Sequence, residues 1–131
     1  MTRTTQREFF LSKSGLRLAA IIERPSHEGR GTIVFAHCFT CSKDLKAIVR
    51  ICRALTEHGW NTCRFDFAGI GQSDGVFADS NFDTNLQDLA GVCDGLAASG
   101  LKVNFLIGHS FGGAAATLYA AEQAAIGHVL S

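Results

Sequence analysis

The chain has 131 residues, of which 47% are hydrophobic and ten are phenylalanine, so it is long and apolar enough for one domain with a packed core. Twelve basic and twelve acidic residues cancel without forming a basic block, which speaks against nucleic acid and against a charged membrane surface as partners. No apolar run approaches the roughly 20 residues of a membrane span, the polar residues 1–8 are unlike a signal peptide, and five cysteines are too few for a disulfide scaffold. We therefore expect a cytoplasmic protein with reduced thiols and a small-molecule partner.

The first part of the chain predicts three strands and a helix. Residues 8–13 and 16–23 form two strand patterns joined by a Ser-Gly turn, which is typical of an antiparallel hairpin. A loop with the only proline leads to a short apolar strand at residues 32–36, and a helix is predicted at residues 43–57. The apolar side chains of that helix recur on one face: Leu45, Ile48, Val49, Cys52 and Leu55.

A second strand–helix unit follows. Residues 61–67 predict a strand that ends in a glycine-rich loop, and residues 81–98 predict a helix. Ser80 and Asp83 are spaced like a capping box at the start of this helix. Its apolar face is formed by Phe82, Leu86, Leu89, Cys93 and Leu96.

The last unit consists of a buried strand at residues 103–107 and an alanine-rich helix at residues 114–125. Residues 126–130 begin a further strand. Because near-continuous apolar strands alternate with helices, the pattern predicts an α/β fold with a doubly wound, mainly parallel sheet and an N-terminal antiparallel hairpin.

A serine stands between two glycines where the last predicted strand meets the last helix. Gly108 and Gly112 flank Ser110 at a spacing of two residues, the pattern of a nucleophile elbow. Small residues are needed there because strand and helix pass close to each other around the strained turn. The helix N-terminus offers free N–H groups and a positive dipole end, which suit a developing oxyanion.

Three segments, in the family's order, resemble the N-terminal half of an α/β-hydrolase domain. Residues 35–39 (Phe-Ala-His-Cys-Phe) resemble the loop that supplies an oxyanion N–H. Residues 64–73 resemble the loop that packs beside the active site, and residues 108–112 resemble the nucleophile elbow. The resemblance covers residues 8–131 and implies an α/β-hydrolase-like fold, truncated after the nucleophile helix.

This resemblance implies a serine hydrolase that acts on an ester, thioester or amide of a small molecule, with no cofactor or metal. Ser110 would form an acyl-enzyme, and the backbone N–H groups of Phe39 and Phe111 would form the oxyanion hole. His37 would shape the oxyanion loop rather than transfer protons. The other residues of the implied active-site loops are Cys38, which stands where the family usually has glycine, with Gly108, His109 and Gly112.

The same resemblance shows what the sequence lacks. The family places its acid and histidine on loops after later strands, whereas after Ser110 this chain has only Glu122 and His128, neither of which we expect to act as the base. We expect residues 1–131 to be the N-terminal portion of a single domain, inactive alone and prone to pair at its sheet edge with the missing part or with itself. Residues 37–44 are also similar to hydrolase domains fused to OsmC-like thiol-peroxidase domains.

Other functions remain open at this point. Cys38 and Cys41 form a CxxC motif before a helix, which suits dithiol redox chemistry, and with His37 they are candidate zinc ligands. A nucleotide-binding loop is less favoured because Asp74 stands where its fingerprint requires a third glycine. A non-catalytic binding module on the same fold is the last alternative. The remaining cysteines are expected to be small core residues: Cys52, Cys63 and Cys93.

Overall fold

The structure is a computed structural model that describes residues 3–37, 42–108, 115–117, 119 and 121 and the backbone of residues 128–130. Its elements, in chain order, are β1 (Arg3–Leu11), β2 (Arg17–Pro25), β3 (Thr32–Ala36), α1 (Lys46–Glu57), β4 (Asn61–Phe65), the 3₁₀ turn η1 (Phe77–Asp79), α2 (Phe82–Ala98), β5 (Val103–Gly108) and β6 (His128–Leu130). The described residues at 115–117, 119 and 121 are helical, as predicted for the segment after β5.

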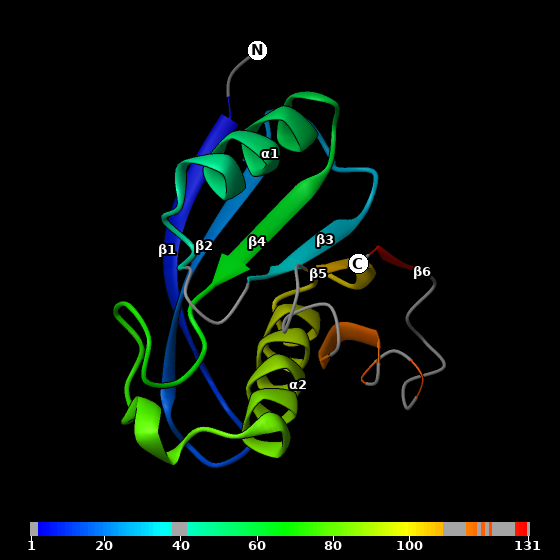
Figure 1. Cartoon of the computed structure of the whole chain (residues 1–131). Coiled ribbons are helices and arrows are strands. Elements are labelled where there is room, and N and C mark those ends of the chain that lie inside the picture. Colours follow the sequence, from blue (N-terminus) through cyan, green and yellow to red (C-terminus); the bar gives the residue numbers. More distant parts are fainter. Residues whose placement is uncertain are drawn as a thin grey trace.

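The strands form a six-stranded sheet in the order β1-β2-β4-β3-β5-β6 (Figure 1). The antiparallel hairpin is confirmed, since β1 pairs with β2 from Arg3 opposite Pro25 to Leu11 opposite Arg17. β2 is also antiparallel to β4, whereas β4, β3, β5 and β6 run parallel to one another. The mainly parallel sheet with its N-terminal hairpin is therefore as predicted.

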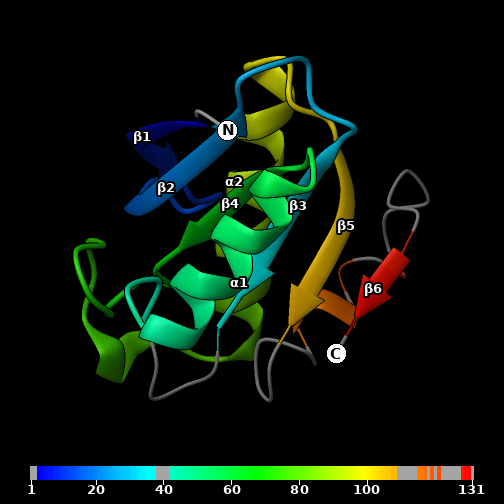
Figure 2. The same ribbon diagram turned by 90° about the horizontal axis from the view of Figure 1, so that it is seen from above.

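Helices cover both faces of the sheet, which makes it doubly wound. In Figure 2, α1 lies in front of the sheet and α2 behind it. The larger core lies on the α2 side, where Leu89, Val92 and Leu96 are fully buried against the strands. Full burial of each such side chain contributes about 1.5–3 kcal/mol. The α1 side holds a smaller cluster of Phe35, Ile48 and Cys52.

Two glycines allow α2 to approach the hairpin closely. A Cβ at Gly91 would collide with the Leu11 carbonyl oxygen, and one at Gly95 would collide with the ring of Phe10. Because Phe10 is itself buried, the outer strand β1 is held to the core through this helix. Glycine is thus required by close packing here, although it is a poor helix former.

The first helix begins later than the sequence predicts. The structure starts α1 at Lys46, whereas the apolar pattern predicts a start at Lys43. The physical reason is that Ser42 and Leu45 close a turn instead, in which the Leu45 N–H donates to the Ser42 carbonyl. Leu45 is consequently exposed, and the buried face of α1 consists of Ile48, Cys52 and Thr56.

The capping box of α2 is also displaced from its predicted position. Asn81, not Ser80, is the N-cap, and its side chain accepts the Thr84 N–H at 2.9 Å. Thr84 Oγ1 in turn accepts the Asn81 N–H at 2.8 Å. Ser80 is unavailable because its hydroxyl donates to the Ala68 carbonyl at 3.1 Å. The predicted Ser80–Asp83 box is therefore wrong by one residue.

The predicted strand near the end of the chain is confirmed as β6. It pairs with β5, with His128 opposite Phe105 and Leu130 opposite Ile107. β5 is therefore an interior strand, and within the described part of the chain β6 forms that edge of the sheet. Among the residues that the structure describes, every helix is too short or too polar to cross a bilayer.

Candidate functional site

The two segments that the sequence assigns to the active site begin side by side at the carboxyl edge of the sheet. β3 and β5 are parallel neighbours, and Ala36 lies opposite Gly108 in their register. Neighbouring strands lie about 4.8 Å apart, so the chain leaves both strands at adjoining points. His37 and Gly108 are the described members of the predicted site. The others lie outside the described residues: Cys38, Phe39, His109, Ser110, Phe111 and Gly112.

His37 is buried at the end of β3 and contacts the segment that follows β4. Its Nε2 accepts the Phe67 N–H at 3.4 Å, and its ring packs edge-on against the Phe67 ring with centroids 5.1 Å apart. As the acceptor of this bond, Nε2 carries no proton in this arrangement. The contact suits the predicted role of shaping the loop, a role that stays a prediction.

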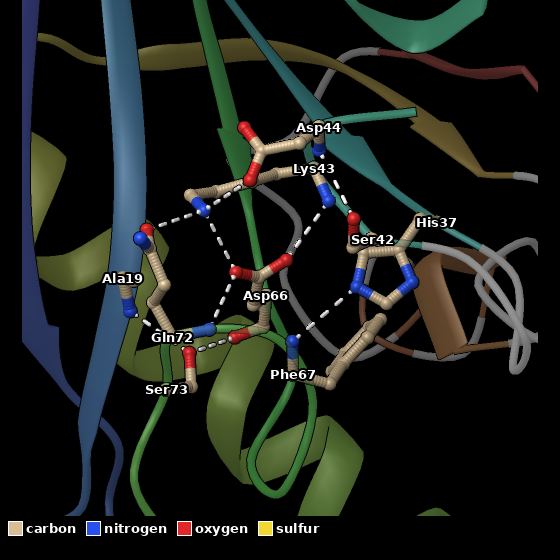
Figure 3. A network of polar contacts seen from close by, with 9 residues as sticks. All are labelled: Ala19, His37, Ser42, Lys43, Asp44, Asp66, Phe67, Gln72 and Ser73. Atoms are coloured by element: carbon tan, nitrogen blue, oxygen red, sulfur yellow. Dashed lines mark hydrogen bonds and ion pairs between the residues drawn. The ribbon is translucent and has the colours of Figure 1, made fainter. Parts of the chain in front are cut away.

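Lys43, which precedes α1, and Asp66, which directly follows β4, form a buried ion pair (Figure 3). Lys43 Nζ lies 2.9 Å from Asp66 Oδ2, and the Lys43 backbone N–H donates to Asp66 Oδ1 at 2.8 Å. The Lys43 and Asp66 side chains are 1% and 0% exposed. Such burial is expensive unless both charges are fully hydrogen-bonded.

The partners of Lys43 meet that requirement. Its ammonium group, which has three N–H donors, lies 2.9 Å from Asp66, 3.0 Å from Gln72 Oε1 and 3.0 Å from Asp44 Oδ2. Each donor therefore has an acceptor. The Gln72 N–H donates to Asp66 Oδ2 as well, at 3.2 Å, so the carboxylate and the amide side chain hold the ammonium from the same turn.

The segment after β4 is built around this carboxylate. Gly71 has a φ of +54°, and a Cβ there would collide with the Asp66 carboxylate. The Ser73 hydroxyl donates to the Asp66 carbonyl at 2.6 Å and accepts the Ala19 N–H at 2.8 Å, which links the turn to β2. Gly71 therefore lets the turn wrap a side-chain carboxylate, an arrangement that does not favour a phosphate at this loop.

A second buried carboxylate holds the same segment from the α2 side. Asp88 Oδ2 accepts the Ala68 N–H at 2.9 Å, whereas Oδ1 has no hydrogen-bond partner among the described residues. Burial raises the pKa of Asp88 to about 6, against the opposing effect of the Ala68 hydrogen bond. Asn85, one turn earlier on α2, is also buried and its Oδ1 has no partner either.

The described cysteines are buried thiols, as predicted. Desolvation raises the pKa of Cys52 to about 11 and that of Cys93 to about 12, and it raises the pKa of Cys63 as well. All three are free thiols. Because the raised pKa keeps them protonated at neutral pH, they are unreactive core residues. Cys38 and Cys41 of the CxxC motif lie outside the described residues.

Two further features of the described part of the chain bear on the site: possible metal ligands and a cavity. There, no three His, Cys, Asp or Glu side chains converge as a metal site requires. A cavity of about 340 Å³ lies at the opposite edge of the sheet, lined in part by Thr32, Asn61 and Asn104 at the amino ends of β3, β4 and β5. In an open α/β sheet, ligands bind beyond the carboxyl ends of the strands, so this cavity does not belong to the predicted site.

Sequence reasoning missed the roles of Lys43 and Asp66, although both lie in segments that it had singled out. Lys43 stands in the octapeptide at residues 37–44, and Asp66 in the loop segment at residues 64–73. A carboxylate directly after a buried strand and before Gly71 was the available signal. Its partner could be found only once β3 and β4 were known to be adjacent.

Solved structures of esterases and other hydrolases share this fold. A ferulic acid-bound Est1E from Butyrivibrio proteoclasticus has a TM-score of 0.85 and 28% identity, over 93% of this chain and 51% of that one. The esterase domain of a Rhodothermus marinus protein has a TM-score of 0.76 and 40% identity, over 98% and 49%. An esterase from Pyrococcus furiosus, at 19% identity, has a TM-score of 0.84 over 95% and 47% and supports the fold alone.

The chain spans about half the length of these solved structures. No curated protein matches it. Residues 27–131 match the family described as serine aminopeptidase, S33. With the α/β-hydrolase fold of its structural neighbours and this match over most of its length, the chain belongs to the serine aminopeptidase S33 family of α/β hydrolases.

Proposed function

We propose that the chain is the N-terminal portion of a serine hydrolase domain that cleaves an ester, thioester or amide of a small molecule through an acyl-enzyme at Ser110. The observation that carries the proposal is the register of β3 and β5. Ala36 lies opposite Gly108 in this register. The segment that contains Phe39 and the segment that contains Ser110 therefore begin at adjoining points of one edge of the sheet. A nucleophile and an oxyanion hole need that proximity.

In this proposal the Ser110 hydroxyl attacks the substrate carbonyl, and the N–H groups of Phe39 and Phe111 stabilise the oxyanion. A serine needs an adjacent base to become a strong nucleophile. His128 is a poor base because its backbone pairs with Phe105, which lies roughly 10 Å along β5 from the carboxyl end at Gly108. The acid and histidine of the triad therefore belong to segments beyond this chain, which we propose to be inactive alone.

We favour an ester as the substrate. One structural relative is named an esterase domain and another binds ferulic acid, whereas the family's name refers to an aminopeptidase. A panel of p-nitrophenyl esters and aminoacyl p-nitroanilides separates these classes. Faster turnover of the esters supports the proposal, and turnover of anilides alone redirects it to peptide bonds.

The nucleophile is tested by covalent labelling of the complete protein that contains these residues. A fluorophosphonate probe is expected to label wild type, and Ser110→Ala is expected to abolish both labelling and ester hydrolysis. Ser26→Ala, at an exposed loop serine, is the matched control and is expected to change neither. Labelling that persists in Ser110→Ala, or activity that depends on Cys38 and Cys41 instead, would contradict the proposal.

We also propose that the outer side of β6 pairs with the remainder of the domain or, in the isolated chain, with a second copy. An unpaired strand offers a row of backbone donors and acceptors for such pairing. Sedimentation of the isolated 131-residue chain beside the complete protein tests this, since a monodisperse monomer of 14.0 kDa would contradict it.

The narrower resemblance to hydrolases fused to OsmC-like domains stays a prediction, as does the cytoplasmic location. Thiol-dependent peroxidase activity of the complete protein would support such a fusion if the activity is lost when the sequence outside the hydrolase domain is deleted. Microscopy of the tagged complete protein would test the location.

A further inference from the structure

The described residues on the two sides of the segment at residues 38–41, which includes Phe39, both contact the segment that follows β4. At its start, His37 accepts the Phe67 N–H and packs on the Phe67 ring. At its end, Lys43 holds Asp66 through both its backbone N–H and its ammonium group. Figure 3 shows the His37 ring beside Phe67 and the Lys43 ammonium group beside Asp66, the preceding residue of the same segment.

The end that carries Lys43 is itself a defined turn. The Leu45 N–H donates to the Ser42 carbonyl at 3.2 Å, and the Asp44 N–H donates to the Ser42 hydroxyl at 3.2 Å. The backbone N–H of Lys43 therefore faces Asp66 from a hydrogen-bonded turn rather than from an extended chain. A displacement of the Asp66 carboxylate would move this turn with it.

The composition of the pair is unusual for a purely stabilising contact. An apolar pair of similar volume is often at least as stable as a buried ion pair, so a buried pair is weak support for a stabilising role. What the charged pair adds is direction, because three acceptors fix the ammonium group and two N–H donors fix the carboxylate. Such a fully satisfied network has one geometry.

We propose that Lys43 is a positioning residue that, through Asp66, sets the place of the Phe39 N–H in the oxyanion hole. The inference rests on the proposed serine hydrolase function. Lys43 does not touch the substrate in this proposal. It acts on the rate because the oxyanion contact is made in the transition state and must be in place before the reaction.

The test is the variant Lys43→Met in the complete protein, which keeps most of the side-chain volume and removes the ammonium group. We expect kcat for a p-nitrophenyl ester to fall on the order of 10²-fold, since a misplacement of about 1 Å can cost that much. KM is expected to change little, because the lost contact is made in the transition state. An alkyl boronic acid, which forms a tetrahedral anion on the nucleophile, is expected to lose affinity by a factor like that of kcat/KM.

Two controls separate positioning from loss of stability. Lys13→Met removes an exposed lysine that pairs with Asp94 far from this loop, and it is expected to leave kcat unchanged. Leu96→Ala, at a buried position of α2, is expected to lower stability without touching the network. If Leu96→Ala lowers kcat as much as Lys43→Met does, the role is structural and the proposal is wrong.

Gln72→Leu keeps the proposal testable if Lys43→Met does not fold. This change removes one exposed acceptor of Lys43 and leaves the ion pair with Asp66 in place. A roughly three- to tenfold loss in kcat with KM unchanged supports positioning, and an unchanged kcat contradicts it. Failure of the fluorophosphonate to label wild-type Ser110 would overturn the proposed function, whereas labelled wild type with full activity in Lys43→Met or Gln72→Leu overturns only this inference.

Discussion

Two buried carboxylates hold the segment after β4 from opposite sides of the sheet, and they do so in different ways. On the α1 side, Asp66 is paired with the ammonium of Lys43 and accepts two backbone N–H groups. On the α2 side, and within the part of the chain that the structure describes, Asp88 accepts only the Ala68 N–H and its second oxygen has no partner. The first carboxylate has a full set of donors, whereas the second is desolvated without a counter-charge.

The difference teaches how burial acts on a carboxylate. An ion pair makes each charge depend on the other, so loss of either partner leaves an isolated charge in the interior. A lone buried carboxylate is instead driven towards its neutral form, and the pKa of Asp88 is accordingly raised to about 6. The α1 side thus depends on charge, and the α2 side depends on pH.

The largest expected effect comes from removing the charge on the α1 side. Asp66→Asn removes the buried counter-ion of Lys43 and leaves only the exposed Asp44 carboxylate beside the ammonium group, and we expect the free energy of unfolding to fall by about 3 kcal/mol at pH 7. Denaturant unfolding of the complete protein measures this. Asp88→Asn is the matched variant and is expected to lose little or nothing. Equal losses in the two variants would show that the carboxylates do not differ as described.

The pH dependence of stability sharpens the comparison from the α2 side. The pKa of Asp88 is raised in the folded protein to about 6 from its ordinary value of 3.8, so the folded state binds this proton more tightly. Its stabilisation is therefore fully present below pH 3.8 and is lost as the pH rises through about 6. By this linkage wild type should lose about 2 kcal/mol more than Asp88→Asn between pH 4 and pH 7.5.

Unfolding curves of both proteins at several pH values across that range give the difference directly. The contribution of every other titrating group cancels between wild type and Asp88→Asn as long as those groups are unaffected by the substitution. A difference that does not change with pH would contradict the raised pKa of Asp88.

What the sequence could predict follows from how local each feature is. The hairpin, the strand–helix order and the buried face with Leu89 and Leu96 depend on periodicity and turn residues, which are written along the chain. The mainly parallel direction of the strands follows from the same pattern, together with the resemblance to α/β hydrolases. These parts were predicted without the structure.

The errors arose where one residue had two possible partners. Ser80 can cap α2 or bind a carbonyl, and the Ala68 carbonyl of the preceding loop wins because that loop passes beside the helix start. Lys43 can begin a helix or bind Asp66, and the buried carboxylate wins. Both outcomes depend on contacts between segments that lie 12 and 23 residues apart, which no local pattern reveals.

A smaller effect is expected from the glycine that lets the turn wrap Asp66. Gly71→Ala introduces a Cβ at a φ of +54° that would collide with the Asp66 carboxylate, and we expect a loss of about 2–4 kcal/mol. Gly15→Ala is the control, because its φ is +86° with nothing within 4 Å of the added Cβ. The control isolates the backbone term of about 1–2 kcal/mol. Denaturant unfolding measures both losses. Equal losses for Gly71→Ala and Gly15→Ala would mean that the Asp66 carboxylate can move away from the added Cβ at no cost.

The smallest effect concerns the start of α2, the helix that carries Asp88. Asn81→Ala removes the side chain that accepts the Thr84 N–H, and we expect a loss of about 1 kcal/mol in the free energy of unfolding. Asp83→Ala, which has no such bond, should cost no more than about 0.5 kcal/mol. Because the cap lies on the α2 side, neither change should alter kcat for the ester, whereas changes to Lys43 should. If Asn81→Ala lowers kcat as Lys43→Met does, the rate depends on stability on both sides of the sheet, and the distinction between a positioning side and a packing side fails.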